Sequence, residues 1–139
     1  MITDMAILAV DPGKTTGCAL WVRGSLMTTS EYQYPTQFLE FAEEITKRYG
    51  RDLVLVIEDF VITAGTAKKS PAPWSLKIIG ALEWLAHKSD TRVVMQKVGD
   101  AKVFATNAKL RQLNLCPPGD HERDACRHLL LYLTRKGAM

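Results

Sequence analysis

The chain has 139 residues, and 47% of them are hydrophobic, so we expect one domain over residues 1–139 with an ordinary apolar core. The net charge of +3, from 18 Lys and Arg against 15 Asp and Glu, is too small to indicate a nucleic-acid partner by itself. No apolar run approaches the roughly 18 residues of a membrane-spanning helix, and the first residues lack the pattern of a signal peptide. These patterns argue against a membrane partner, and we expect the protein in the cytoplasm.

The predicted elements alternate between buried strands and amphipathic helices. Residues 5–11 form a continuous apolar run that ends at Asp11, as in a strand buried on both faces. The remaining elements, in chain order, are strands over 17–22 and 26–34, a helix over 35–50, a buried strand over 53–60, a helix from Pro71 or Pro73 to about 88, a short strand over 91–96, a basic segment over 97–111 and a helix from Gly119 or Asp120. This order predicts an α/β fold with a mixed five-stranded sheet flanked by helices.

The helix over 71–88 is apolar around most of its circumference. One stripe has helical spacing, and further apolar residues lie well outside it: the stripe is Trp74, Ile78, Ala81 and Leu85, and the others are Leu76, Ile79, Leu82 and Trp84. Such a helix is buried on more than one side. A core on one face and a subunit partner on the other would satisfy the pattern.

Two carboxylates stand at the ends of buried strands. Asp11 ends the first apolar run and Glu58 ends the run that starts at residue 53. The two-residue period of a strand places each acid on the same face as alternate apolar residues of its run. A desolvated carboxylate there is costly without a cation, and ligands of open α/β sheets bind at these strand ends. A divalent metal ion would satisfy both conditions.

Three further polar residues open the last helix. Asp120, His121 and Asp124 fall within about 100° of helical arc and could face one point. Asp120 is either a member of that set or the N-cap of the helix. Asp124 precedes an apolar stretch, a poor position for an unpaired charge, which favours a metal role.

This set of ligands suits phosphodiester hydrolysis. Two cations held about 3.5–4 Å apart by carboxylates can activate water and stabilise the leaving oxygen. Carboxylates suit Mg²⁺ or Mn²⁺, and Mn²⁺ tolerates an added imidazole. The residues therefore predict a metal-dependent nuclease with Asp11, Glu58 and Asp124 as ligands, and His121 on the same helical arc as a candidate.

Several segments together resemble the RuvC-type Holliday junction resolvases, a branch of the RNase H-like fold. The first strand with Asp11-Pro12-Gly13, followed by Thr16-Gly17, is similar to the opening motif of that family. Residues 56–58 match its second acidic strand, and His121-x-x-Asp124 followed by Ala125 matches its closing helix. Residues 97–113 resemble its lysine-bearing segment, so the similarity runs in order over nearly the whole chain.

The resemblance implies a homodimer that nicks four-way DNA junctions with two Mg²⁺ or Mn²⁺ ions per active site. Asp11, Glu58, His121 and Asp124 would be the catalytic metal ligands, and the 71–88 helix would form the dimer. The chain is shorter than bacterial members and similar to compact bacteriophage members, whose enzymes act in the host cytoplasm.

Candidate DNA contacts come from the same resemblance and from the distribution of charge. Lys102 or Lys109 would approach phosphates of the scissile strand, and Phe60 lies one residue from the expected position of a junction-wedging aromatic. Residues 61–82 contain Lys68, Lys69 and Lys77 and no acid, and residues 97–111 contain four basic residues against Asp100. Such lysines would contact phosphates in a salt-dependent manner.

Two alternatives belong to other functional classes. One is a catalytically silent, dimeric module that binds branched DNA with the same fold. The other is an actin-like or sugar-kinase-like phosphotransferase, because Asp11-Pro12-Gly13 followed by Thr15 resembles the first phosphate loop of those proteins. Such proteins need a second comparable domain around the nucleotide, for which 139 residues leave no room.

Overall fold

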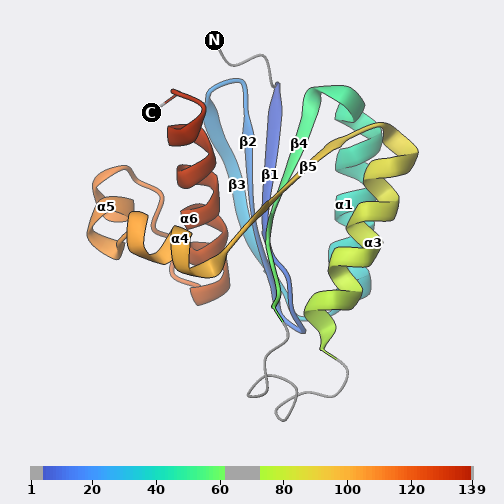
Figure 1. Cartoon of the computed structure of the whole chain (residues 1–139), viewed down its shortest axis with the longest axis horizontal. Helices are drawn as coiled ribbons and strands as arrows, with labels where there is room; N and C mark the ends of the chain where they lie inside the picture. Colours follow the sequence, from blue (N-terminus) through green and yellow to red (C-terminus); the bar gives the residue numbers. More distant parts are fainter. Residues whose placement is uncertain (1–4, 62–72, 139) are drawn as a thin grey trace.

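A mixed sheet lies at the centre of the molecule (Figure 1). The computed structural model describes residues 5–61 and 73–138, and within them the five-stranded sheet has the order β3-β2-β1-β4-β5. The strands are β1 (Ala6–Asp11), β2 (Thr16–Val22), β3 (Ser25–Tyr32), β4 (Leu53–Glu58) and β5 (Arg92–Gln96). β1 pairs antiparallel with β2 and parallel with β4, while β4 pairs parallel with β5. The α/β fold with a mixed five-stranded sheet is therefore confirmed.

Helices cover both faces of this sheet (Figure 1). α1 (Pro35–Tyr49), followed by the short 3₁₀ helix η1 (Gly50–Asp52), packs with α3 (Trp74–Ser89) on one face. α6 (Asp120–Arg135) packs on the other face. Within the described residues, no helix combines the length and the apolar character that crossing a bilayer would require.

The alternation of side chains along the central strands divides the core in two. Leu8 and Leu55 contribute to the core under α1 and α3, whereas Ile7 and Val56 contribute to the core under α6. Both strands are buried on both faces, which explains their continuous apolar runs. Asp11 and Glu58 continue the alternation on the α6 side, as their spacing predicts.

The basic segment over 97–111 folds into two short helices that the sequence pattern did not reveal. They are α4 (Val98–Phe104) and α5 (Asn107–Gln112). Thr106 caps α5, because its hydroxyl accepts a hydrogen bond of 3.2 Å from the Lys109 N–H. Helices of seven and six residues make too few turns to display an amphipathic period.

α3 buries only part of its apolar surface. Its buried residues include Ile78, Leu82 and Leu85. Trp74, which the spacing groups with Ile78 and Leu85, is 40% exposed, and Trp84 is 60% exposed. The helix therefore has one face in the core and large aromatic side chains on its outer surface.

Candidate metal-binding site

The polar side chains of Asp11, Glu58 and Gln96 lie next to one another at the carboxyl ends of the parallel strands β1, β4 and β5. β1 and β4 pair up to Val10 and Ile57, so Asp11 comes next to Glu58. Glu58 in turn is the register partner of Gln96 on β5. All three follow the strand alternation onto the face covered by α6, and the structure therefore brings the two predicted acids together.

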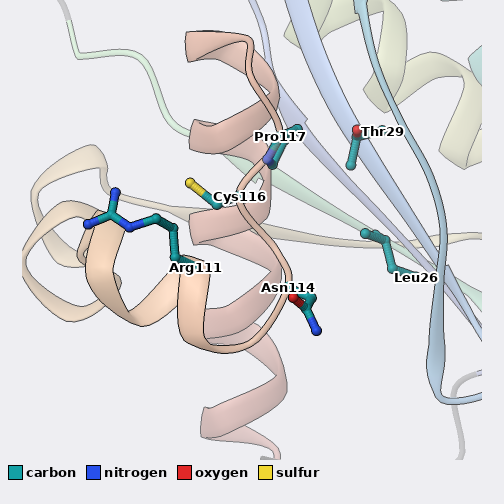
Figure 2. Close-up of a pocket in the computed structure, with 6 residues that line it drawn as sticks. All are labelled: Leu26, Thr29, Arg111, Asn114, Cys116 and Pro117. Atoms are coloured by element: carbon teal, nitrogen blue, oxygen red, sulfur yellow. The ribbon is translucent and has the colours of Figure 1, made fainter.

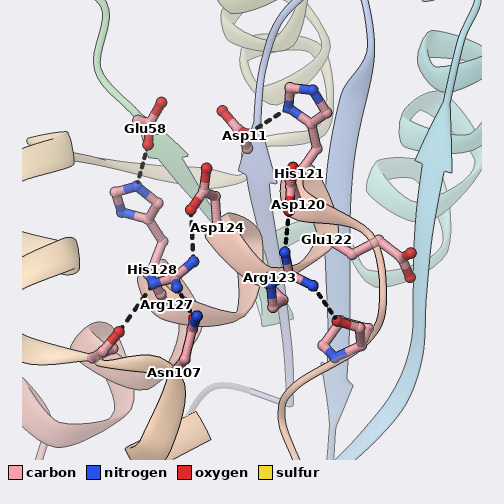
Figure 3. A network of polar contacts seen from close by, with 12 residues as sticks. Asp11, Glu58, Asn107, Asp120, His121, Glu122, Arg123, Asp124, Arg127 and His128 are labelled. Atoms are coloured by element: carbon pink, nitrogen blue, oxygen red, sulfur yellow. Dashed lines mark hydrogen bonds and ion pairs between the residues drawn. The ribbon is translucent and has the colours of Figure 1, made fainter.

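α6 supplies the opposite wall of the site. His121, Asp124 and His128 have helical spacings of three and four residues, so they share one face of the helix (Figure 3). His121 Nδ1 lies 3.0 Å from Asp11 Oδ2, and His128 Nε2 lies 2.9 Å from Glu58 Oε1. Each strand-end acid is thus in contact with its own imidazole from α6.

Gly17 allows α6 to approach the sheet this closely. It pairs with Asp11 across β1 and β2. A Cβ atom at this position would lie 2.7 Å from the Glu122 nitrogen and would overlap the carbonyl group of His121. Only glycine leaves enough space for the first turn of α6 to pass over β2 and place His121 beside Asp11.

A carboxylate from β3 fixes the beginning of α6. Glu31 Oε2 accepts hydrogen bonds from the backbone N–H groups of His121, at 2.7 Å, and Glu122, at 3.2 Å. The Glu31 carboxylate thereby satisfies two of the backbone N–H donors that have no partner within the helix, at a helix N-terminus where negative charge is also favourable. The N-cap residue itself is Gly119, so the predicted capping role of Asp120 is wrong; Asp120 is exposed and pairs with Arg123.

Asp124 is held by an arginine one turn further along α6. Arg127 Nη1 donates to Asp124 Oδ1 at 2.7 Å, and its Nε donates to the Ala105 carbonyl at 3.0 Å. Its other terminal nitrogen contacts the side chain of Asn107 (Figure 3). Arg127 therefore links the predicted ligand Asp124 to the connection between α4 and α5.

The charges of the site are distributed unequally between the two acids. Burial, followed by the charge of Glu58, raises the pKa of Asp11 to about 7. Burial also acts to raise the pKa of Glu58, but the contact with His128 outweighs it and the pKa is lowered. Burial acts to lower the pKa of His121, yet the hydrogen bond and charge of Asp11 raise it. Of the two strand-end acids, Asp11 is therefore the one whose charged form the surroundings disfavour.

A divalent cation fits this arrangement through its donor chemistry. Among the described residues, no group of three or more His, Cys, Asp or Glu side chains is gathered closely enough to hold a metal. Mg²⁺, however, commonly takes one or two carboxylates and keeps waters or substrate phosphates as its other ligands. Asp11 and Glu58 supply such a pair, and a cation would offset both the burial and the charge of Glu58 that raise the pKa of Asp11.

The predicted DNA-contacting residues have different surroundings. Lys102 lines a hollow beside Asp124, and its charge helps to lower the pKa of Glu58. Lys109 Nζ lies 4.1 Å from the centroid of the Phe104 ring, and Lys109 lines a separate hollow between α4 and α6. Phe60 is partly buried against the core under α1 and α3. Lys68 and Lys69 lie outside the described residues.

Two surface hollows differ in the chemistry of the residues that line them. One, of about 390 Å³, lies between β3 and the α5–α6 connection and is lined by Leu26, Thr29, Arg111, Asn114, Cys116 and Pro117 (Figure 2). The other, of about 570 Å³, is lined by the basic residues Lys102, Arg123 and Arg127, the acids Asp120 and Asp124, and Thr106 and Asn107. The second hollow includes the candidate ligand Asp124, and Lys102 is its cation for an anionic ligand, since Arg123 and Arg127 are paired with Asp120 and Asp124.

Sequence comparison and structural comparison give different results. No protein-family model matches the sequence, and no curated protein matches it. The structure of RuvC from Thermus thermophilus in complex with a Holliday junction substrate matches with a TM-score of 0.67 and 19% identity, over 96% of this chain and 97% of that chain. A second Thermus thermophilus RuvC structure matches with a TM-score of 0.65 and 17% identity, over 96% of this chain and 98% of that one. The chain therefore has the RNase H-like fold of RuvC, as its motifs indicated.

Proposed function

We propose that this chain is a metal-dependent endonuclease that cleaves Holliday junctions or related branched DNA. The observation that carries the proposal is the adjacent pair of strand-end carboxylates, Asp11 and Glu58, facing His121 and Asp124 on α6. The fold is similar to that of RuvC, and one RuvC structure contains a Holliday junction substrate. This similarity supports the proposed activity on branched DNA. The fold alone would not identify an activity, so the residues of the site carry the argument.

In this proposal, four side chains hold two Mg²⁺ or Mn²⁺ ions: Asp11, Glu58, His121 and Asp124. When bound, such ions activate a water molecule and stabilise the leaving oxygen of a phosphodiester. Arg127 keeps the Asp124 carboxylate at the rim of the basic hollow, since it binds one of its oxygens. Lys102 lines the same hollow and is positioned to attract a DNA phosphate toward the acids.

A cleavage assay with a labelled four-way junction tests the activity. We expect the chain to nick the junction with Mn²⁺ or Mg²⁺ and to lose all cleavage when EDTA removes the ion. A linear duplex of the same sequence serves as the control and should remain uncut under the same conditions. Absence of cleavage with both ions would refute the proposal.

A catalytically silent DNA-binding module remains the competing function, and two observations favour it. Asp124 is bound to Arg127, and no three candidate ligands converge among the described residues. A module of this kind would shift the labelled junction in a gel without nicking it under any divalent ion. The same junction substrate therefore distinguishes the two functions.

We also propose that α3 forms a homodimer, which would place two active sites on one junction. Its outer surface exposes Trp74, Leu76 and Trp84. A hollow of about 340 Å³ beside Trp84 is lined by residues of α1 and α3, including Leu39, Ala81 and Leu85. Exposed aromatic side chains next to an apolar hollow are typical of the central residues of a protein interface.

Trp84→Glu is expected to weaken this dimer strongly. A central tryptophan commonly contributes about 2 kcal/mol or more, so the dimer dissociation constant should rise about 30-fold or more. Light scattering coupled to size exclusion measures the change over a range of protein concentrations. Val103→Glu is the matched control, because Val103 is 84% exposed on α4, across the sheet from α3. Equal dimerisation of both variants and wild type would contradict this interface.

A further inference from the structure

His128 occupies an unusual position for a histidine. Its residue is 1% exposed, and its neighbours along α6 include the core residues Leu129 and Leu130. Both ring nitrogens nevertheless have polar partners: Nε2 donates to Glu58 Oε1 at 2.9 Å, and Nδ1 lies 2.9 Å from Gln96 Oε1. A buried polar ring with both nitrogens satisfied is held in one orientation, because any rotation would break a hydrogen bond.

The sheet register explains how one ring reaches both partners. Glu58 and Gln96 are direct neighbours on the parallel strands β4 and β5, so their side chains emerge on the same face. The imidazole of His128 bridges them from α6. Because Nε2 carries the proton that Glu58 accepts, Nδ1 accepts a hydrogen bond from the Gln96 amide when the ring is neutral and donates one to Gln96 Oε1 when the ring is charged.

The two imidazoles of the site differ in accessibility. The side chain of His121 is 46% exposed, so it can turn away from Asp11 or bind a cation itself. His128 has no such freedom, because its side chain is 1% exposed and contacts Glu58 with Nε2. Since Oε1 of Glu58 is held by His128, Oε2 would be the oxygen available to a cation.

We propose that His128 is a positioning residue that orients the Glu58 carboxylate for a divalent cation. Gln96 fixes the orientation of the ring through its contact with Nδ1. The inference rests on the proposed function, since it assumes that Glu58 is a metal ligand. Hydrogen bonds to ligating carboxylates are a common means of fixing a ligand and tuning its metal affinity. A histidine that merely fills the core would need its ring shape and no donor toward Glu58.

Two substitutions distinguish the role of the His128 hydrogen-bond donor from the role of its ring shape. His128→Phe keeps a buried ring and removes the N–H, whereas His128→Gln keeps an N–H within reach of Glu58 and removes the ring. Mn²⁺ binding by the full chain without DNA, measured from the electron paramagnetic resonance signal of unbound Mn²⁺, provides a readout independent of cleavage. We expect Mn²⁺ to bind about 10–100-fold more weakly to His128→Phe and within about threefold of wild type to His128→Gln.

The possible outcomes separate this inference from the proposed function. Equal Mn²⁺ binding by wild type and His128→Phe, with weaker binding by His128→Gln, would show a role in packing only and overturn the inference. A wild-type chain that binds no Mn²⁺ would overturn the proposed function and the inference with it. Circular dichroism checks that each variant folds; if His128→Phe does not, Gln96→Leu replaces it, and wild-type Mn²⁺ affinity in that variant would overturn the inference.

Discussion

Asp11→Asn is expected to slow metal-dependent cleavage strongly while leaving a folded and more stable protein. Removing a charged ligand from a two-metal site should slow cleavage about a thousandfold, which corresponds to about 4 kcal/mol of transition-state stabilisation. Mn²⁺ should raise the melting temperature of wild type, because a ligand that binds only the folded state stabilises it. The same ion should have little effect on the variant.

The gain in stability follows from the direction of the pKa shift. The folded state raises the pKa of Asp11 from 3.8 to about 7, so it favours the protonated acid. The contribution of Asp11 to stability therefore falls as the pH rises from about 4 to about 7, by at most about 4 kcal/mol for a shift of this size. An asparagine does not ionise, so in the absence of metal the urea midpoint of Asp11→Asn should exceed that of wild type at pH 8. The difference should disappear near pH 4.

Asp52→Asn is the matched control for these measurements. Asp52 is exposed and precedes β4, at the end of that strand opposite Glu58. Its substitution should change neither the cleavage rate nor the stabilisation by Mn²⁺. If Asp11→Asn cleaved as fast as this control, Asp11 would have no role in the chemistry.

The strands and their terminal acids could be predicted because the relevant signals are local. A buried strand is a short apolar run, and the period of two fixes the face of Asp11 and of Glu58 from a few neighbouring residues. The closing helix was predicted for the same reason, since Cys126, Leu129 and Leu133 recur at helical spacing and are all buried. For these elements, sequence and structure agree within one or two residues.

The contacts that organise the site could not be predicted in this way. The bonds of His128 to Gln96 and Glu58 span 32 and 70 residues, and the bond of Glu31 to the beginning of α6 spans 90. They depend on the strand register and on how α6 packs, neither of which is encoded in a local period. His128 does share a helical face with His121 and Asp124, and this spacing was the one signal that could have revealed it.

Gly17→Ala is expected to disrupt the site through the backbone, although position 17 contributes no side chain to it. The new methyl group would overlap the carbonyl of His121 and approach the Glu122 nitrogen to 2.7 Å. Both neighbours are main-chain atoms in the first turn of α6, so relief requires the helix to move rather than a side chain to rotate. We expect a loss of about 3 kcal/mol in unfolding free energy, near the upper end of the range for overpacking.

The displacement should also affect the chemistry, because it separates two groups that α6 and β1 bring together. His121 would move away from Asp11, and the hydrogen bonds that Glu31 accepts from the first turn would lengthen. Mn²⁺ binding should therefore weaken even at temperatures where Gly17→Ala remains folded, which urea unfolding and Mn²⁺ titration measure separately.

Gly99→Ala provides the opposite case for comparison. Gly99 lies in α4, and a Cβ there meets nothing within 4 Å. Alanine should be neutral or slightly stabilising, because glycine loses more conformational entropy in a helix. If Gly17→Ala resembled Gly99→Ala in both stability and Mn²⁺ affinity, the close approach of α6 to β2 would not be what places His121 beside Asp11.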